Sequence, residues 1–163
     1  AAVRVLVAGD PAVGKTSLVE MICTAGSGQN TEWVSTSQQH EWTCGCALSL
    51  MRECIEVDMR SVDVEVELWE VGGTQMYARA RPVFYDSPDA ILLVYDVSNM
   101  KSYHNLVVWL FELCTSVWPP SLRYWDAGGG SGGEPDVDLE AGDGGPLQRA
   151  ILGGRCPVLF VAH

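Results

Sequence analysis

Apolar positions along the chain predict strands and helices in alternation. Residues 3–7 form an apolar run typical of a buried strand, and the residues from Lys15 onward have the pattern of a helix. Residues 43–57 and 62–69 are predicted to be paired strands, because the second segment is apolar at every other position. The uninterrupted apolar run 90–95 is typical of a strand buried on both faces, and a last apolar strand is expected at 157–162.

The remaining segments predict one further helix and one exposed loop. Ser98 is positioned to cap the start of a helix in which apolar residues recur at helical spacing between residues 106 and 113. The polar stretch from Ser27 to Glu41 is expected to be an exposed loop. Strands and helices in this order predict an α/β fold with a mostly parallel sheet covered by helices.

One segment interrupts this pattern. Residues 119–150 contain eight of the 17 glycines, four of the eight prolines and six acidic residues against two arginines. A segment with so little to bury is expected to be a flexible, Gly-rich acidic insertion within a single domain that covers 1–163. An acidic docking segment is the functional alternative to a plain linker.

Composition limits the kinds of protein and partner that this chain suits. At 163 residues it suits one domain with a substantial core. No apolar run reaches the ~18 residues of a membrane-spanning helix and no charged-then-apolar leader opens the chain, so a soluble, intracellular, cytoplasmic protein is expected. The net charge of −11 repels nucleic acid and anionic membrane, which disfavours both as partners.

The six cysteines predict reduced thiols. None forms a C-x-x-C pair, and several lie within apolar runs. Zinc binding by His40, Cys44, Cys46 and Cys54 is the alternative, although their spacing matches no standard ligand pattern.

The strongest chemical signal lies between the first strand and the first helix, where the chain fits the phosphate-loop pattern G-x-x-x-x-G-K-[ST]. Backbone N–H groups of the loop and of the helix start would bind phosphates, Lys15 would reach the β and γ oxygens, and the Thr16 hydroxyl would bind Mg²⁺. A Gly-rich turn that opens an ordinary helix is the alternative. The predicted binding residues here are Gly9, Asp10, Pro11, Ala12, Val13, Gly14, Lys15, Thr16 and Ser17.

Three stretches together resemble the small Ras-like GTPases. They are the phosphate loop with its strand, residues 42–46 (W-T-C-G-C), which look like switch I, and residues 67–73 (E-L-W-E-V-G-G), which look like the start of switch II. Residues 84–85, 94–99 and 101–110 are similar to Rab-type GTPases, and the wording of switch II is most like the atypical Rab-like protein 3 group and its plant light-insensitive-period relatives. The resemblance implies a three-layer P-loop NTPase fold, here a small G domain expected to be truncated after its fifth strand.

The resemblance also implies roles for residues outside the loop. Thr43 matches the switch I threonine that engages Mg²⁺, and Gly73 matches the switch II glycine whose N–H meets the γ-phosphate. A surface strand threonine and a turn glycine are the alternatives. Glu70 stands where the family has the Asp that holds Mg²⁺, so the metal residues are expected to be Thr16, Thr43 and Glu70.

Two further positions bear on hydrolysis. Thr74 follows Gly73 where active members place the Gln that orients the attacking water, and Gln75 lies one residue further along. With Lys15, these are the candidate catalytic residues. Pro11 removes one backbone donor from the loop. Together with Glu70, these departures suggest weak intrinsic hydrolysis.

The leading hypothesis is therefore a switch that binds GTP or GDP with Mg²⁺, hydrolyses GTP slowly and signals to effectors under an exchange factor and an activating protein. A pseudo-GTPase scaffold is the second hypothesis, and an ATP-using P-loop enzyme is the third. Guanine selectivity rests on the resemblance alone, because the N-K-x-D segment is absent from this sequence. A homodimer is expected only by family analogy, and membrane association only through segments outside this sequence.

Overall fold

The computed structural model describes residues 2–25, 33–35, 43–115 and 156–163. Their secondary structure alternates between strands and helices, with two short 3-10 turns. The elements are β1 (Ala2–Ala8), α1 (Lys15–Ala25), β2 (Trp33–Ser35), β3 (Cys46–Val57), β4 (Arg60–Val71), η1 (Gln75–Tyr77), η2 (Arg81–Phe84), β5 (Ala90–Tyr95), α2 (Met100–His104), α3 (Leu106–Thr115) and β6 (Val158–Ala162).

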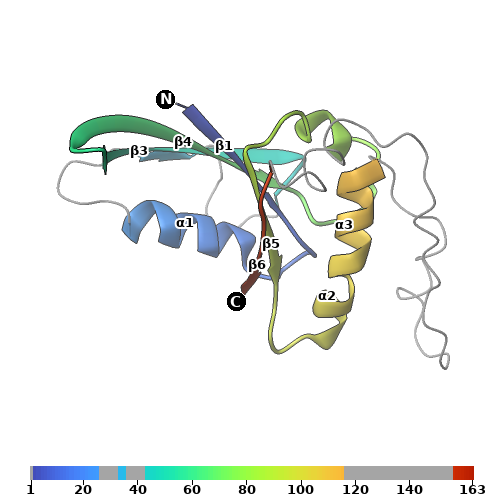
Figure 1. Ribbon diagram of the computed structural model, residues 1–163. Coiled ribbons are helices and arrows are strands. Elements are labelled where there is room, and N and C mark those ends of the chain that lie inside the picture. Colours follow the sequence, from blue (N-terminus) through green and yellow to red (C-terminus); the bar gives the residue numbers. More distant parts are fainter. Residues whose placement is uncertain (1, 26–32, 36–42, 116–155) are drawn as a thin grey trace, which may run out of the picture.

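The strands form one six-stranded sheet in the order β2-β3-β4-β1-β5-β6 (Figure 1). β1 pairs in parallel with β4 and β5, and β5 pairs in parallel with β6. The two pairs at the other edge, β2 with β3 and β3 with β4, are antiparallel. The expected α/β fold with a mostly parallel sheet is confirmed.

Helices cover both faces of this sheet, which gives three layers. Alternate residues of β1 point to opposite faces, so Val7 packs with α1 residues such as Leu18, whereas Leu6 packs with α3 residues such as Trp109. Each face thereby has its own apolar cluster, and Figure 1 shows α1 and α3 on opposite sides of the sheet. The continuous apolar character of β5 follows from this arrangement, because its residues Leu93 and Val94 are buried in different clusters.

Two expectations about local structure were wrong. Within the segment expected to be an exposed loop, residues 33–35 form strand β2, which pairs with β3 at the edge of the sheet. The side chain that caps the second helical region belongs to Asn99, which accepts a hydrogen bond from the backbone N–H of Lys101, rather than to Ser98. Ser98 instead donates its N–H and its hydroxyl to the carboxylate of Asp96.

The predicted helix is also divided in two. α2 ends at His104 and α3 begins at Leu106, and the backbone carbonyl of the intervening Asn105 accepts a hydrogen bond from the N–H of Trp109. The predicted insertion at 119–150 lies outside the described residues, so its character stays a prediction.

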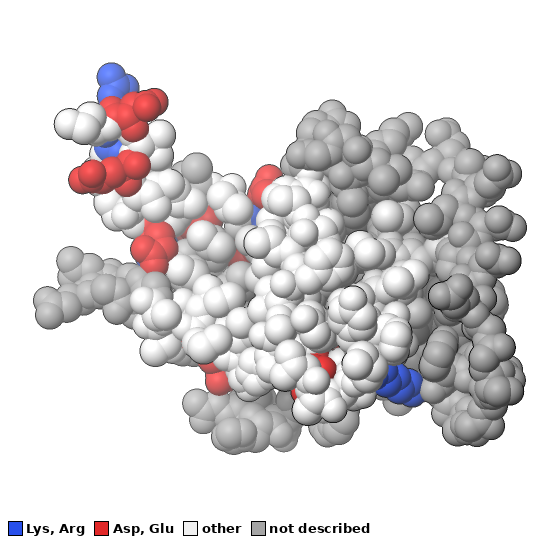
Figure 2. All heavy atoms as spheres, turned by 60° about the horizontal axis from the view of Figure 1, so that its bottom comes forward, with Lys and Arg blue, Asp and Glu red and all other residues white. Residues whose placement is uncertain are grey.

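The β3–β4 hairpin projects from one end of the sheet (Figure 1). On the face shown in Figure 2, charged side chains gather at this projecting end, and most of the remaining described surface is uncharged. The exposed charges of the hairpin are Arg52, Glu56, Asp58, Arg60 and Asp63. Among the helices that the structure describes, none has the length and apolar character needed to cross a bilayer.

Candidate functional site

The register of the sheet brings the three predicted site segments to one edge. Val7, near the end of β1, lies opposite Glu70 near the end of β4, so the loop that follows β1 and the segment that follows β4 leave the sheet together. Cys46, the first residue of β3, lies opposite Val71, so Thr43 enters the sheet at the same edge. The carboxyl ends of parallel strands are the usual place for a ligand in an α/β sheet.

The phosphate loop has the tight backbone that its glycines permit. Gly9 has φ +148°, and a Cβ atom there would lie 2.2 Å from the carbonyl oxygen of Val94, so only glycine fits. Ala12 also has a positive φ, +61°, in a region where a non-glycine residue costs about 1–2 kcal/mol. The loop therefore holds strained backbone at a place where the motif predicts function.

Lys15 is buried at the base of this loop, at the start of α1. Its Nζ donates hydrogen bonds to the carbonyl oxygens of Gly9 (3.1 Å) and Asp10 (2.8 Å). Burial, opposed in part by the nearby carboxylates of Glu70 and Asp10, lowers the pKa of Lys15 to about 8. A buried ammonium at the base of a phosphate-loop motif is a favourable site for an anion such as a phosphate.

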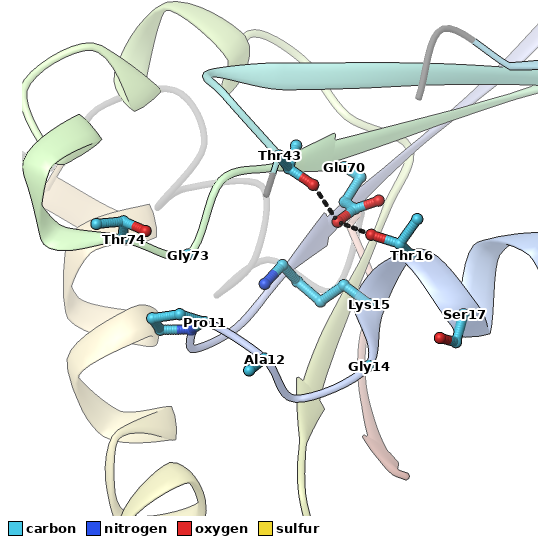
Figure 3. A pocket seen from close by; sticks show the side chains of 10 residues that line it. All are labelled: Pro11, Ala12, Gly14, Lys15, Thr16, Ser17, Thr43, Glu70, Gly73 and Thr74. Carbon is cyan, nitrogen blue, oxygen red and sulfur yellow. Dashed lines mark hydrogen bonds between the residues drawn. The ribbon is translucent and has the colours of Figure 1, made fainter. Parts of the chain in front are cut away.

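Two hydroxyls and one carboxylate meet beside Lys15 (Figure 3). Oε1 of the buried Glu70 accepts hydrogen bonds from the hydroxyls of Thr16 (2.8 Å) and Thr43 (2.9 Å). These are the hard oxygen donors that Mg²⁺ prefers, so the residues present fit a magnesium ion that also contacts phosphate and water. The Glu70 side chain, which is one methylene longer than the Asp expected from the resemblance, thus reaches the same two hydroxyls on which the predicted metal site depends.

The segments around Gly72 and Gly73 close the other side of the pocket. The N–H of Gly72 donates to the carbonyl oxygen of Gly45 (2.8 Å), which joins the segment after β4 to the segment after Thr43. A Cβ atom on Gly73 would lie 2.5 Å from the carbonyl oxygen of Gly9 and 2.6 Å from the nitrogen of Pro11, so this glycine allows the backbone to pack directly on the phosphate loop. The cavity between these segments is partly open to solvent and has a volume of about 150 Å³.

Most of the predicted site residues therefore lie around one cavity. Its lining consists of residues from the phosphate loop, from α1 and from the segments that contain Thr43 and Gly73: Pro11, Ala12, Gly14, Lys15, Thr16, Ser17, Thr43, Glu70, Gly73 and Thr74. Gly9 and Asp10 contribute the carbonyl oxygens that hold Lys15. Val13 is buried in the apolar cluster beneath α1, and Gln75 is exposed on η1 outside the cavity lining.

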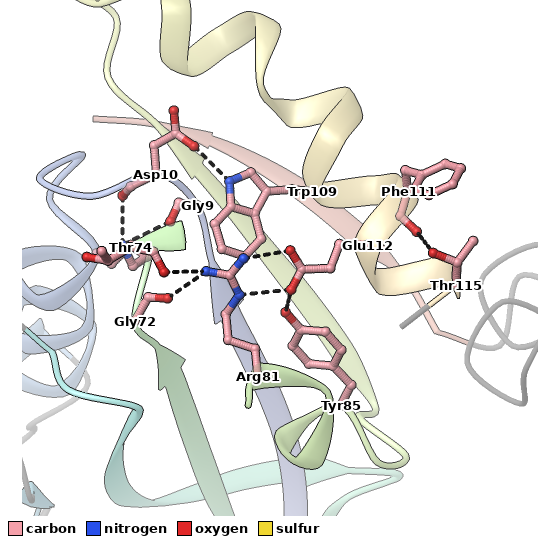
Figure 4. Close-up of polar contacts among 11 residues, drawn as sticks. Gly9, Asp10, Gly72, Thr74, Arg81, Tyr85, Trp109, Phe111, Glu112 and Thr115 are labelled. Carbon is pink, nitrogen blue, oxygen red and sulfur yellow. Dashed lines mark hydrogen bonds and ion pairs between the residues drawn. The ribbon is translucent and has the colours of Figure 1, made fainter. Parts of the chain in front are cut away.

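Sequence reasoning missed a buried polar cluster behind this cavity (Figure 4). Arg81 and Glu112 are fully buried and form a two-point ion pair, with Nε to Oε1 at 2.8 Å and Nη2 to Oε2 at 2.6 Å. The phenol of Tyr85 donates to Glu112, and its pKa is raised well above the usual range, first by burial and then by the Glu112 carboxylate. In the sequence, the one signal of this cluster was Glu112, an acidic residue within the apolar helix 106–115, because such a residue needs a buried partner.

All six cysteines are free thiols. Burial and, to a smaller extent, the nearby Glu70 carboxylate raise the pKa of Cys46 to about 12, so this thiol stays protonated. Among the described residues, which do not include His40, no three His, Cys, Asp or Glu side chains are grouped as a metal site.

The fold and the loop define a phosphate-loop α/β domain of the Ras-like type. A family model described as "Ras of Complex, Roc, domain of DAPkinase" matches residues 4–118. The chain therefore belongs to the Roc and Rab-like group of small GTPase domains. This family consists of GTP-binding switches, which supports the coarse functional expectation.

Curated relatives agree with this assignment. The chain is 38% identical over 115 residues to Rab-like protein 3 of Xenopus tropicalis, a match that covers 68% of this chain and 45% of the relative. It is 37% identical to human Rab-like protein 3, again over 68% of this chain and 45% of the relative. A human intraflagellar transport protein 27 homolog is 28% identical over 109 residues, or 67% of this chain and 54% of the relative. The chain thus spans about half the length of these relatives.

Proposed function

We propose that this protein is a guanine-nucleotide-dependent switch that binds GTP or GDP with Mg²⁺ and hydrolyses GTP slowly. One observation carries the proposal: Lys15, the two threonine hydroxyls, Glu70 and Gly73 lie around a single cavity at the carboxyl edge of the sheet. Thr16 comes from the first helix and Thr43 from the segment before β3, so an ion between them would connect the nucleotide to switch I.

Each of these residues has a distinct task in the proposed site. Lys15 contributes a positive charge toward the β and γ oxygens, and Gly73 brings a backbone N–H close to the loop. Thr16, Thr43 and Glu70 hold magnesium, which, when bound, neutralises charge on the phosphates. Thr74 occupies the place from which a water would be oriented, and its short side chain reaches less far than Gln, so unassisted hydrolysis is slow.

Nucleotide titration of the full-length protein tests this function. GTP and GDP are expected to bind in the presence of Mg²⁺ with a Kd of about 1 μM or lower. Lys15→Ala is expected to weaken binding about tenfold to a hundredfold, because it removes a charged hydrogen-bond donor from the phosphates. Fluorescence titration with labelled nucleotides gives both numbers.

Lys101→Ala is the matched control for that experiment. Lys101 is the other lysine of the chain and lies exposed on α2, so its removal changes the net charge equally without touching the cavity. If the parent binds nucleotide and Lys15→Ala binds it with the same affinity, the nucleotide lies outside this cavity. Absence of micromolar binding by the parent would remove the proposed function.

A pseudo-GTPase scaffold is the second candidate, and two residues favour it. Glu70 makes direct hydrogen bonds to both threonine hydroxyls, and Thr74 stands in the cavity lining where active members have Gln. In this role the protein holds nucleotide constitutively, or holds none, and acts through its partners.

Single-turnover hydrolysis separates a slow enzyme from a scaffold. Thr74→Gln is expected to raise the rate about tenfold or more if the site is a slow GTPase, because Gln can orient the attacking water. Thr24→Gln, at an exposed position near the end of α1, is the control. A parent rate typical of an active small GTPase would exclude the scaffold, whereas no turnover in either protein would favour it.

Effectors, an exchange factor and an activating protein are the partners that this function requires, and they would contact the segments around Thr43 and Gly73. A cytoplasmic location is proposed with it. A homodimer remains an expectation from family analogy.

A further inference from the structure

The buried ion pair between Arg81 and Glu112 needs an explanation beyond stability. Both side chains are fully buried, and removal of two charges from water costs about as much as their attraction returns, so an apolar pair of similar size would stabilise the core as well. Glu112 lies on α3 and Arg81 begins η2, just after switch II. The pair therefore connects the segment that follows β4 to helix α3.

The third nitrogen of Arg81 points to a specific use. Nη1 donates hydrogen bonds to the carbonyl oxygens of Gly72 (3.1 Å) and Thr74 (3.0 Å). These two residues flank Gly73, so one guanidinium holds the carbonyl groups of the residues before and after the switch II glycine (Figure 4). Gly73 itself packs directly on the backbone of the phosphate loop.

The phosphate loop is fastened to the same helical region. Asp10 accepts hydrogen bonds from Asn105 Nδ2 (2.6 Å), just before α3, and from Trp109 Nε1 (2.9 Å), within α3. The Arg81 guanidinium lies 4.4 Å from the centre of a Trp109 ring, which adds a cation–π contact between the two anchors. The start of the phosphate loop, through Asp10, and the segment around Gly73, through Arg81, are thus both held by α3 and the residue before it.

We propose that Arg81, held by Glu112, is a positioning residue that fixes Gly73 in its phosphate-binding place independently of nucleotide. The four hydrogen bonds that form this anchor join Arg81 to the Glu112 carboxylate and to the carbonyl oxygens of Gly72 and Thr74. Recognition of the terminal phosphate is then pre-organised, because binding need not order the Gly73 segment. This inference rests on the proposed function and adds the regulation of its switch II.

The test removes the anchor without leaving a buried charge. In the double variant Arg81→Met/Glu112→Gln of the full-length protein, affinity for a nonhydrolysable GTP analogue is expected to fall about tenfold, whereas affinity for GDP changes less than about twofold. The difference follows because only the triphosphate uses Gly73. Arg52→Met/Glu65→Gln is the matched control, since this exposed pair on the β3–β4 hairpin has an Nε to Oε2 distance of 3.1 Å and lies away from the cavity.

A merely structural role would give a different result. If both affinities of the Arg81/Glu112 variant fell in parallel, or if the ratio of GTP analogue to GDP affinity matched that of the parent, the positioning role would be overturned. The control pair is expected to leave both affinities unchanged.

Hydrogen exchange of the Gly72 amide, whose N–H donates to the carbonyl oxygen of Gly45, gives an independent readout in nucleotide-free protein. This amide is expected to exchange slowly in the parent and in the Arg52/Glu65 control, and at least about tenfold faster in the Arg81/Glu112 variant. Equal exchange in parent and variant would overturn the anchor. A parent that binds no nucleotide but shows this exchange pattern would refute the proposed function and leave the anchor standing.

Discussion

At the scale of single residues, Glu70 distinguishes this site most clearly. Its carboxylate is buried and contacts both threonine hydroxyls directly, at 2.8 and 2.9 Å through one oxygen. An Asp at this position would end one methylene earlier and leave more space between the hydroxyls and the carboxylate. The extra length therefore lets Glu70 contact both hydroxyls directly, so this carboxylate has to withdraw from them before it can hold a metal ion.

Glu70→Asp is predicted to strengthen the response to magnesium. The shorter carboxylate withdraws from the two hydroxyls, so the Mg²⁺ concentration that half-saturates binding of a GTP analogue should fall about tenfold, a change typical of groups around a metal's ligands. Magnesium titration with a fluorescent analogue measures it. Glu65→Asp, five residues earlier on the same strand, should change nothing. A higher magnesium requirement in Glu70→Asp would show that the longer side chain is the better ligand.

At the scale of elements, the β3–β4 hairpin has an unfavourable turn. Its two-residue loop consists of Asp58 and Met59, with φ values of +49° and +62°. Positive φ at both positions defines a type I′ turn, which matches the twist of the strands and favours Asp-Gly. Met59 is 98% exposed, so no packing compensates for its strained backbone.

Met59→Gly is predicted to stabilise the protein. Relief of the left-handed strain, less the greater freedom of glycine in the unfolded chain, should add about 0.5–1 kcal/mol to the free energy of unfolding. Denaturant unfolding measures the change. Met100→Gly, also exposed but at the start of α2, should lower the free energy of unfolding by up to about 1 kcal/mol. A loss of stability in both variants would contradict the turn argument.

At the scale of the whole molecule, α3 and the sheet together hold the segments that form the cavity. Strand register sets the phosphate loop beside Glu70 and Thr43, and α3 holds Asp10 on one side and Arg81 on the other. The cavity is therefore a property of the complete layered fold rather than of the loop alone.

How much the sequence predicts depends on how local each feature is. The strand, phosphate loop and first helix are contiguous, so a short pattern with its apolar context predicts them together. The pair Arg81–Glu112 joins residues 31 positions apart, and only the packing of α3 on the sheet brings them together. Strand β2 was missed because it has three residues and depends on pairing with β3. Asn99 and Ser98 are both good caps, and the backbone conformation decides between them.

The most direct test of this account is a crystal structure of the full-length protein with a nonhydrolysable GTP analogue and Mg²⁺. The terminal phosphate is expected within hydrogen-bond distance of Lys15 Nζ and the Gly73 N–H, with the metal on the hydroxyls of Thr16 and Thr43. An analogue bound elsewhere, or a cavity that side chains keep closed at saturating analogue, would contradict it.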